Sequence, residues 1–184
     1  MPMLGFTFYA AFLGTFLSIT FLTYITWKEH HPDLPRSFSQ LVAQNRRLVN
    51  WFRGASAVCP TLFSVTVYFL IMPNVRYAVA LFVVWSTAYA SELLLALFPE
   101  RGTIEKQLHS FFAYNMGLAM IVTAFILFLS LSGGYRVLEL GITIGMVTLG
   151  LLFTQLDRER FIFYELAFIY SSHASILVAA VALK

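Results

Sequence analysis

Charged residues are scarce in this sequence. Only 11% of its 184 residues are Asp, Glu, Lys or Arg, whereas 59% are hydrophobic and 17% are aromatic. A soluble domain carries about 25% charged residues, so this chain could not cover a surface that faces water. Disorder is excluded by the same numbers, because disordered segments are poor in apolar and aromatic residues. The composition indicates an integral membrane protein and excludes a soluble enzyme.

Cysteine is nearly absent as well, since Cys59 is the only one. An internal disulfide is therefore excluded, and so is the paired spacing of a thiolate metal site. The lysines are Lys28, Lys106 and Lys184, all outside the apolar runs, which excludes a retinal-type Schiff base within a span. No HExxH, Walker, GxSxG or dinucleotide-binding glycine pattern occurs, so no common motif predicts a reaction or a cofactor.

Long apolar runs, by contrast, are abundant. Each approaches the 20 or so helical residues that cross a hydrocarbon core. Strands are not expected, because the runs show no strict alternation and unpaired backbone groups are costly in lipid. The sequence predicts an all-α polytopic membrane protein, a single domain over 1–184 with six transmembrane helices in one bundle. The predicted spans are 4–27, 55–72, 75–98, 108–131, 135–155 and 161–182.

Residues 28–54 form the only sizeable loop, and its second half has the pattern of a basic amphipathic helix. Apolar residues recur there at helical spacing, namely Phe38, Leu41, Val42, Leu48, Val49 and Phe52. The basic residues that accompany them are Arg36, Arg46, Arg47 and Arg53. One interpretation is an interfacial helix whose arginines meet anionic lipid headgroups. The other is that the segment extends the second span.

Lys and Arg are unevenly divided between the two sets of loops. The first, third and fifth loops hold nine of them, and the other side holds Arg76, Arg136 and Lys184. By the positive-inside rule, the richer loops face the cytosol and both termini are non-cytoplasmic. The net charge of +3 therefore indicates membrane orientation rather than nucleic-acid binding. The first apolar run, 4–26, is too long for a signal-peptide core of roughly 7–15 residues, so it is expected to be a transmembrane span that is not cleaved off.

Ionisable side chains inside spans indicate a structural or functional role. Placing each one in the membrane costs at least about 2.5 kcal/mol unless it is paired or in contact with water. We select six candidates for one polar cavity on the cytosolic side: Glu92, His109, Asn115, Glu165, Ser172 and His173. Glu92, His109 and Glu165 are expected in one layer near the cytosolic ends of their spans, with Asn115 and His173 deeper. Glu139 enters from the opposite face and is expected to be separate.

Two interpretations of these residues stay open. In the functional one, a carboxylate and one or two imidazoles carry out acid–base work or bind a cation within a cavity. In the structural one, Glu92 pairs with a loop arginine, His109 lies at the membrane interface and His173 bonds to a neighbouring hydroxyl. The adjacent His30 and His31 are expected to be solvated loop residues, because neighbouring positions on a helix point about 100° apart.

Three functions are compatible with this sequence. We expect a protein that binds or moves a lipid headgroup or a small solute, with membrane lipids as its partners. The first alternative is a lipid-modifying hydrolase or transferase that uses His and Glu. A minor alternative is a haem-bearing electron carrier with His109 and His173 as axial ligands. Gly141 and Gly145 form a small-xxx-small pair, expected to serve packing within the bundle or association into a homo-oligomer.

The segment Leu97-Phe98-Pro99, followed by His109, Ala113 and Gly117, resembles a small six-span bacterial membrane family of unknown function near the DRAM and Frag-type proteins. The similarity covers mainly residues 90–120. Ser91 and Leu94 also match, as does an arginine before the last span, Arg158 or Arg160. Glu100 departs from the pattern, which often has Asp there. The resemblance implies a fold and a membrane location and no reaction.

Overall fold

The computed structural model describes residues 2–29, 38–43, 45–98, 102–155 and 161–184. These residues are almost all helical and include no strand: α1 (Pro2–Glu29), α2 (Phe38–Ala43), α3 (Arg46–Thr66), η1 (Val67–Ile71), η2 (Met72–Asn74), α4 (Ala78–Leu97), α5 (Thr103–Ser130), α6 (Gly133–Gln155) and α7 (Phe161–Ala182). Six helices, with α3 and its η1 and η2 extensions taken as one, are long and apolar enough to cross a membrane. The predicted all-α, six-span membrane bundle is confirmed.

The second span begins earlier than predicted, at Arg46 instead of residue 55. The Asn45 side chain caps the helix by accepting a hydrogen bond from the backbone N–H of Arg47 at 3.0 Å. The helix continues through Pro60, then widens to a π-helical turn over Val67–Ile71. The span ends with the short η2 helix, in which Pro73 cannot donate a helical hydrogen bond.

The basic amphipathic segment is thus divided between two helices. Its second half, with Arg47 and Arg53 exposed, extends α3. Its first half forms α2, whose apolar side chains Phe38, Leu41 and Val42 are buried. They pack against α1, α3 and α7 through Leu22, Ile25, Val49, Ile162 and Leu166. The second half therefore extends the second span, as one of the two interpretations expected, and the bundle covers the apolar face of α2. Contact of the arginines with lipid headgroups stays a prediction. Arg36 and the side chain of Arg46 lie outside the described residues.

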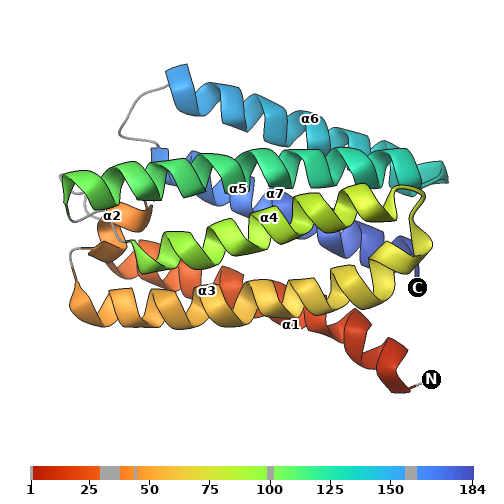
Figure 1. Cartoon of the computed structure of the whole chain (residues 1–184), viewed down its shortest axis with the longest axis horizontal. Helices are drawn as coiled ribbons and strands as arrows, with labels where there is room; N and C mark the ends of the chain where they lie inside the picture. The colour runs from red at the N-terminus through yellow and green to blue at the C-terminus, as the bar shows by residue number, and fades with distance from the viewer. Residues whose placement is uncertain (1, 30–37, 44, 99–101, 156–160) are drawn as a thin grey trace.

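Five of the spans form a closed ring. α1 packs against α3 and α7, α4 packs against α3 and α5, and α5 packs against α7. α6 lies on the outside of this ring against α5 and α7 (Figure 1). The turn into α6 needs Gly133, whose φ of 57° is in the left-handed region that glycine adopts without strain.

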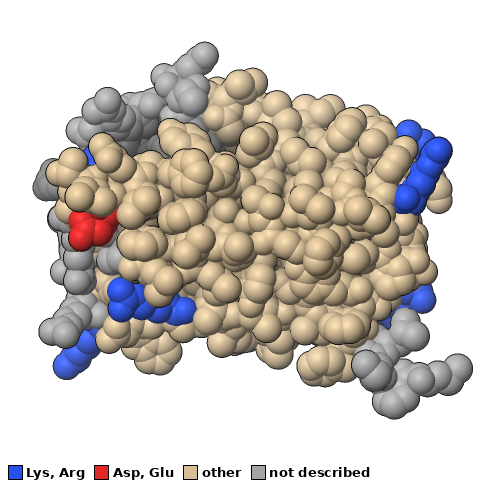
Figure 2. All heavy atoms as spheres, viewed as in Figure 1, with Lys and Arg blue, Asp and Glu red and all other residues tan. Residues whose placement is uncertain are grey.

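Charged side chains gather at the two ends of the molecule, and the broad middle band of the face in Figure 2 has none. Both termini lie at one end of the bundle, and α2 lies at the other (Figure 1). Near the α2 end, Trp27 and Trp51 are 81% and 70% exposed, as expected for aromatic residues that sit at a membrane interface. The distribution of charge and aromatic residues fits an integral, multi-pass membrane protein.

Candidate functional site

A cavity of about 120 Å³ lies inside the ring. Its walls come from α1, α3, α4, α5 and α7, and Phe38 of α2 borders one end. α6 contributes no residue to the lining. The α5 wall consists of His109, Ala113, Met116 and Met120, which are spaced three or four residues apart and therefore share one face of the helix. The bundle thus encloses an apolar chamber within the membrane-spanning region.

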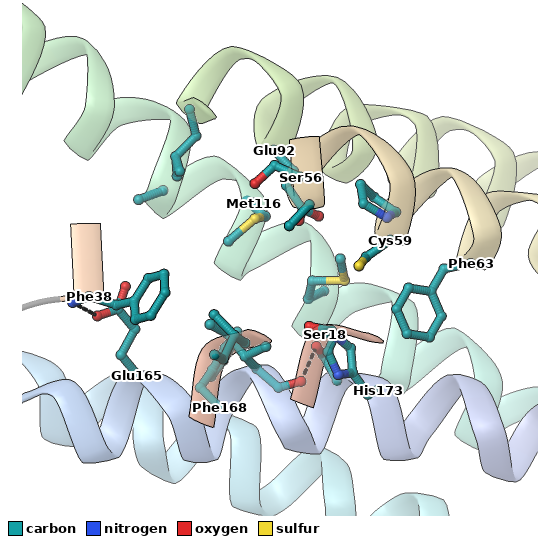
Figure 3. A pocket seen from close by; sticks show the side chains of 18 of the residues that line it. Ser18, Phe38, Ser56, Cys59, Phe63, Glu92, Met116, Glu165, Phe168 and His173 are labelled. Atoms are coloured by element: carbon teal, nitrogen blue, oxygen red, sulfur yellow. Dashed lines mark hydrogen bonds between the residues drawn. The ribbon is translucent and has the colours of Figure 1, made fainter. Parts of the chain in front are cut away.

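All of the predicted cavity residues except Asn115 line this chamber: Glu92, His109, Glu165, Ser172 and His173. They come from α4, α5 and α7, so helices far apart in the sequence bring them together (Figure 3). Asn115 precedes the lining residue Met116 on α5 and points to a different side of the helix, because successive helical residues are rotated by about 100°.

Glu165 is positioned by a backbone contact. Its Oε2 accepts a hydrogen bond of 2.8 Å from the N–H of Phe38, the first residue of α2 (Figure 3). A helix leaves its first N–H groups without internal partners, so a carboxylate there supplies an acceptor and complements the helix dipole. Glu165 therefore anchors α2 across one end of the chamber.

His109 is 4% exposed and is tied to the end of α4. Its Nδ1 lies 2.9 Å from the carbonyl oxygen of Phe98, the residue that ends the helix. Nδ1 carries the proton in this contact, because a carbonyl oxygen can only accept. The interaction joins α4 to α5 at the α2 end of the chamber. It also links two of the residues on which the family resemblance rests.

Glu92 differs from Glu165 in lacking a partner. Its carboxylate lies in the chamber near Ser56 and Met116 (Figure 3). Within the described part of the chain, it has neither a hydrogen bond nor an ion pair. Arg53, the described loop arginine that reaches α4, instead donates to the carbonyl oxygens of Ala96 and Leu97 at 3.3 and 3.5 Å. The expected pairing of Glu92 with a loop arginine is therefore not found among the described residues.

His173 lies deeper in the chamber. Its ring stacks on Phe63, with 4.7 Å between ring centroids and 22° between the planes. Its Nδ1 is buried and has no hydrogen-bond partner among the described residues. The neighbouring hydroxyl of Ser172 donates to the carbonyl oxygen of Ile169 at 2.7 Å, so it is engaged with its own helix. An imidazole with an unused nitrogen thus borders the apolar end of the chamber.

Sequence reasoning missed part of the lining. Ser18, Ser56, Cys59 and the two methionines of α5 have small or apolar side chains that resemble lipid-facing residues, so no local signal marks them. The aromatic lining residues were also unmarked: Phe21, Phe38, Phe52, Phe63, Trp85 and Phe168.

Glu139 is outside the chamber, as its position on the opposite side of the membrane indicated. It is fully buried, and one carboxylate oxygen accepts a hydrogen bond from the hydroxyl of Ser175 on α7. The other oxygen, Oε2, has no partner among the described residues. Glu139 therefore ties α6 to the ring and takes no part in the candidate site.

The structure brings no cluster of three or more His, Cys, Asp or Glu residues together at metal-binding spacing among the residues that it describes. His30, His31, Pro99, Glu100, Arg101, Arg158 and Arg160 lie outside those residues. Comparison with known protein families, curated proteins and solved structures finds no match. The resemblance to the DRAM and Frag-type neighbourhood therefore stays a prediction, and function is argued from the chamber alone.

Proposed function

We propose that this membrane protein binds one small amphipathic molecule inside the helical ring. The carrying observation is a chamber with apolar walls that also holds two carboxylates and two imidazoles, Glu92, Glu165, His109 and His173. Such a combination of a mostly apolar wall with few polar groups is typical of small-molecule sites. A chamber volume of about 120 Å³ is small, so the ligand has a short apolar chain or a small ring.

The distribution of basic residues among the loops predicts which end of the chamber faces the cytosol. The polar residues Glu165 and His109 lie toward α2, at the end where the basic loops are. Under the positive-inside rule this end faces the cytosol, so the ligand's polar group is expected at the cytosolic end of the chamber. The solute or lipid headgroup anticipated from the sequence would occupy this position.

The two alternative functions, a lipid-modifying enzyme and a haem-bearing electron carrier, require arrangements of residues beyond the apolar chamber with its few polar groups. A hydrolase or transferase requires a nucleophile hydrogen-bonded to its base. Ser172 donates to a backbone carbonyl, and Ser175, which does donate to an acid, pairs with Glu139 outside the chamber. The haem alternative still depends on His109 and His173 as a pair. No observation favours either alternative over binding, so both stay predictions.

A cavity-filling substitution tests the proposal. Ala113→Phe introduces a ring into the chamber, whereas Ala57→Phe, on the exposed face of α3, serves as the matched control. Each protein is purified in lipid nanodiscs and extracted with organic solvent, and released small molecules are identified by mass spectrometry. We expect a compound that co-purifies with the wild type and the control but not with Ala113→Phe. Equal recovery from all three, with both variants folded, would contradict binding inside the ring.

A further inference from the structure

The charges and rings of the chamber define the class of ligand. We infer that the bound molecule is a lipophilic cation, a protonated amine or quaternary ammonium group on a short apolar body, recognised by Glu92. This inference rests on the proposed function and specifies its ligand. It depends on three observations: a carboxylate without a described partner, the absence of lysine and arginine from the described lining, and the number of aromatic rings.

The first observation is the state of Glu92. A carboxylate removed from water is costly unless it is paired and hydrogen-bonded, and Glu92 has no partner within the described chain. Glu165, the other acid of the lining, already accepts from the N–H of Phe38. Glu92 is therefore the carboxylate that a ligand is able to complement, and a positive group on the ligand would offset the cost of burying it.

The second observation concerns the sign of the charge. Among the described residues, the lining contains the acids Glu92 and Glu165 but no lysine and no arginine. Arg53, on the lining helix α3, is exposed and is directed to carbonyl oxygens at the end of α4. Phosphate and carboxylate groups are bound in proteins by arginine, lysine or arrays of backbone N–H groups. The chamber therefore disfavours an anionic ligand and a headgroup that carries phosphate.

The third observation is the density of aromatic rings. Five phenylalanines and Trp85 line a volume of about 120 Å³. The indole N–H of Trp85 is occupied, because it donates to the hydroxyl of Ser64 at 2.9 Å, so it is not available to a ligand. Aromatic faces attract ammonium groups, and quaternary ammonium is recognised in this way. A chamber that holds both an acid and several rings is the combination that suits an organic cation.

Four hexyl compounds with different head groups test the inference: hexyltrimethylammonium, hexylphosphocholine, hexanesulfonate and hexanol. Binding is measured in nanodiscs from the fluorescence of Trp85 after Trp27→Phe and Trp51→Phe leave it as the only tryptophan. We expect hexyltrimethylammonium to bind at least about tenfold more tightly than hexanol, and hexanesulfonate to bind most weakly. Hexylphosphocholine should bind more weakly than hexyltrimethylammonium, because the described lining has no lysine or arginine for its phosphate. Equal binding of these two compounds would support recognition of the ammonium group but overturn the exclusion of phosphate headgroups.

Glu92→Gln provides the test of mechanism. It should reduce the affinity for hexyltrimethylammonium at least about tenfold and leave that for hexanol unchanged, because only the cation interacts with the charge. Glu139→Gln is the matched control, since it alters an acid that is equally within the spans but outside the chamber. Equal affinities for all four compounds would overturn the cation inference while leaving amphiphile binding intact. If none of the four compounds binds, both the cation inference and the proposed function fail.

Discussion

Glu92, Glu139 and Glu165 lie within the spans but have different surroundings. Glu165 accepts a hydrogen bond from the backbone of α2, Glu139 accepts one from Ser175, and Glu92 faces the chamber without a described partner. The same residue type therefore attaches a short helix in one case and an outer helix in another, and in the third we propose that it recognises a ligand. Each purpose predicts a different response to substitution.

Loss of the Glu165 carboxylate should loosen α2. Glu165→Ala removes the acceptor of the Phe38 N–H, whereas Glu165→Gln retains an oxygen that can accept. Cys59 lines the chamber and is the only cysteine, so it reports access without further engineering. We expect N-ethylmaleimide to modify Cys59 several-fold faster in Glu165→Ala than in the wild type or Glu165→Gln, measured by the mass shift over time. Unchanged rates in all three proteins would show that α2 does not control access.

Substitution of Glu139 should affect stability rather than binding. Glu139→Ala leaves the Ser175 hydroxyl without its partner and opens a void between α6 and α7, at a cost of about 1–3 kcal/mol. Glu139→Gln preserves an acceptor for the same hydroxyl and removes a buried acid, so we expect it to be as stable as the wild type. Thermal unfolding in detergent, followed by circular dichroism, separates the two variants. A Glu139→Ala protein as stable as Glu139→Gln would contradict this role.

At the scale of elements, the closest described contact between a glycine and a neighbouring helix is the α1–α3 contact. A Cβ added at Gly14 would lie 3.3 Å from both the carbonyl oxygen of Cys59 and the Cβ of Leu62. Nearby, the hydroxyl of Thr66 donates to the carbonyl oxygen of Thr7 at 2.6 Å. α1 and α3 therefore approach so closely that a side chain at Gly14 must displace backbone atoms.

The predicted packing of Gly141 and Gly145 within the bundle is, in contrast, wrong. A Cβ at either position would have no atom within 4 Å in the described structure. Gly141 is exposed on the outer helix α6. A homo-oligomer through these glycines stays a proposal, because a second copy would have to supply the neighbour that the bundle does not.

We expect Gly14→Leu to destabilise the protein by about 1–3 kcal/mol, because overpacking outweighs the gain of up to about 1 kcal/mol in helix propensity. Gly141→Leu is the control: it gains the same propensity without a clash. Thermal unfolding compares the two, and size-exclusion chromatography with light scattering reports their assembly. Equal stability of the two variants would contradict the close contact. A smaller particle for Gly141→Leu alone would support association through α6.

The six spans could be predicted from sequence because apolar length is a local property. The start of α3 was misjudged because Arg46, Arg47 and Arg53 suggest a boundary, whereas Asn45 supplies the cap before them. The shared layer of Glu92, His109 and Glu165 was predictable from their depths along the spans, whereas the sequence left open whether His109 and His173 share a site. Asn115 was misplaced because depth does not determine the direction of a side chain around its helix. The packing of α2 against α1, α3 and α7 is a long-range contact that no local pattern contains.

At the scale of the whole molecule, the described charges divide the bundle into two ends (Figure 2). Because the six spans return the chain to its starting side, both termini share one end (Figure 1). The excess of basic residues at the other end predicts that the termini are non-cytoplasmic.

Cysteine labelling in intact cells tests this orientation. In a Cys59→Ala protein, a new cysteine replaces either Asn50, exposed at the α2 end, or Arg136, exposed near the opposite end. A membrane-impermeant maleimide should modify Arg136→Cys in intact cells and Asn50→Cys only after the membrane is opened. Labelling in the reverse order would invert the topology and with it the side from which the chamber is entered.

The position of α6 outside the ring has a mechanical consequence. α6 lines no part of the chamber, yet it is the span that its surroundings, such as a thicker bilayer or an adjoining subunit, can shift most directly. Such a shift would pass to the interior through its packing on α5 and α7 and through the Glu139–Ser175 bond to α7, which also carries Glu165 and His173. The outer helix is thus placed to transmit the state of the surrounding bilayer to a chamber that it does not line.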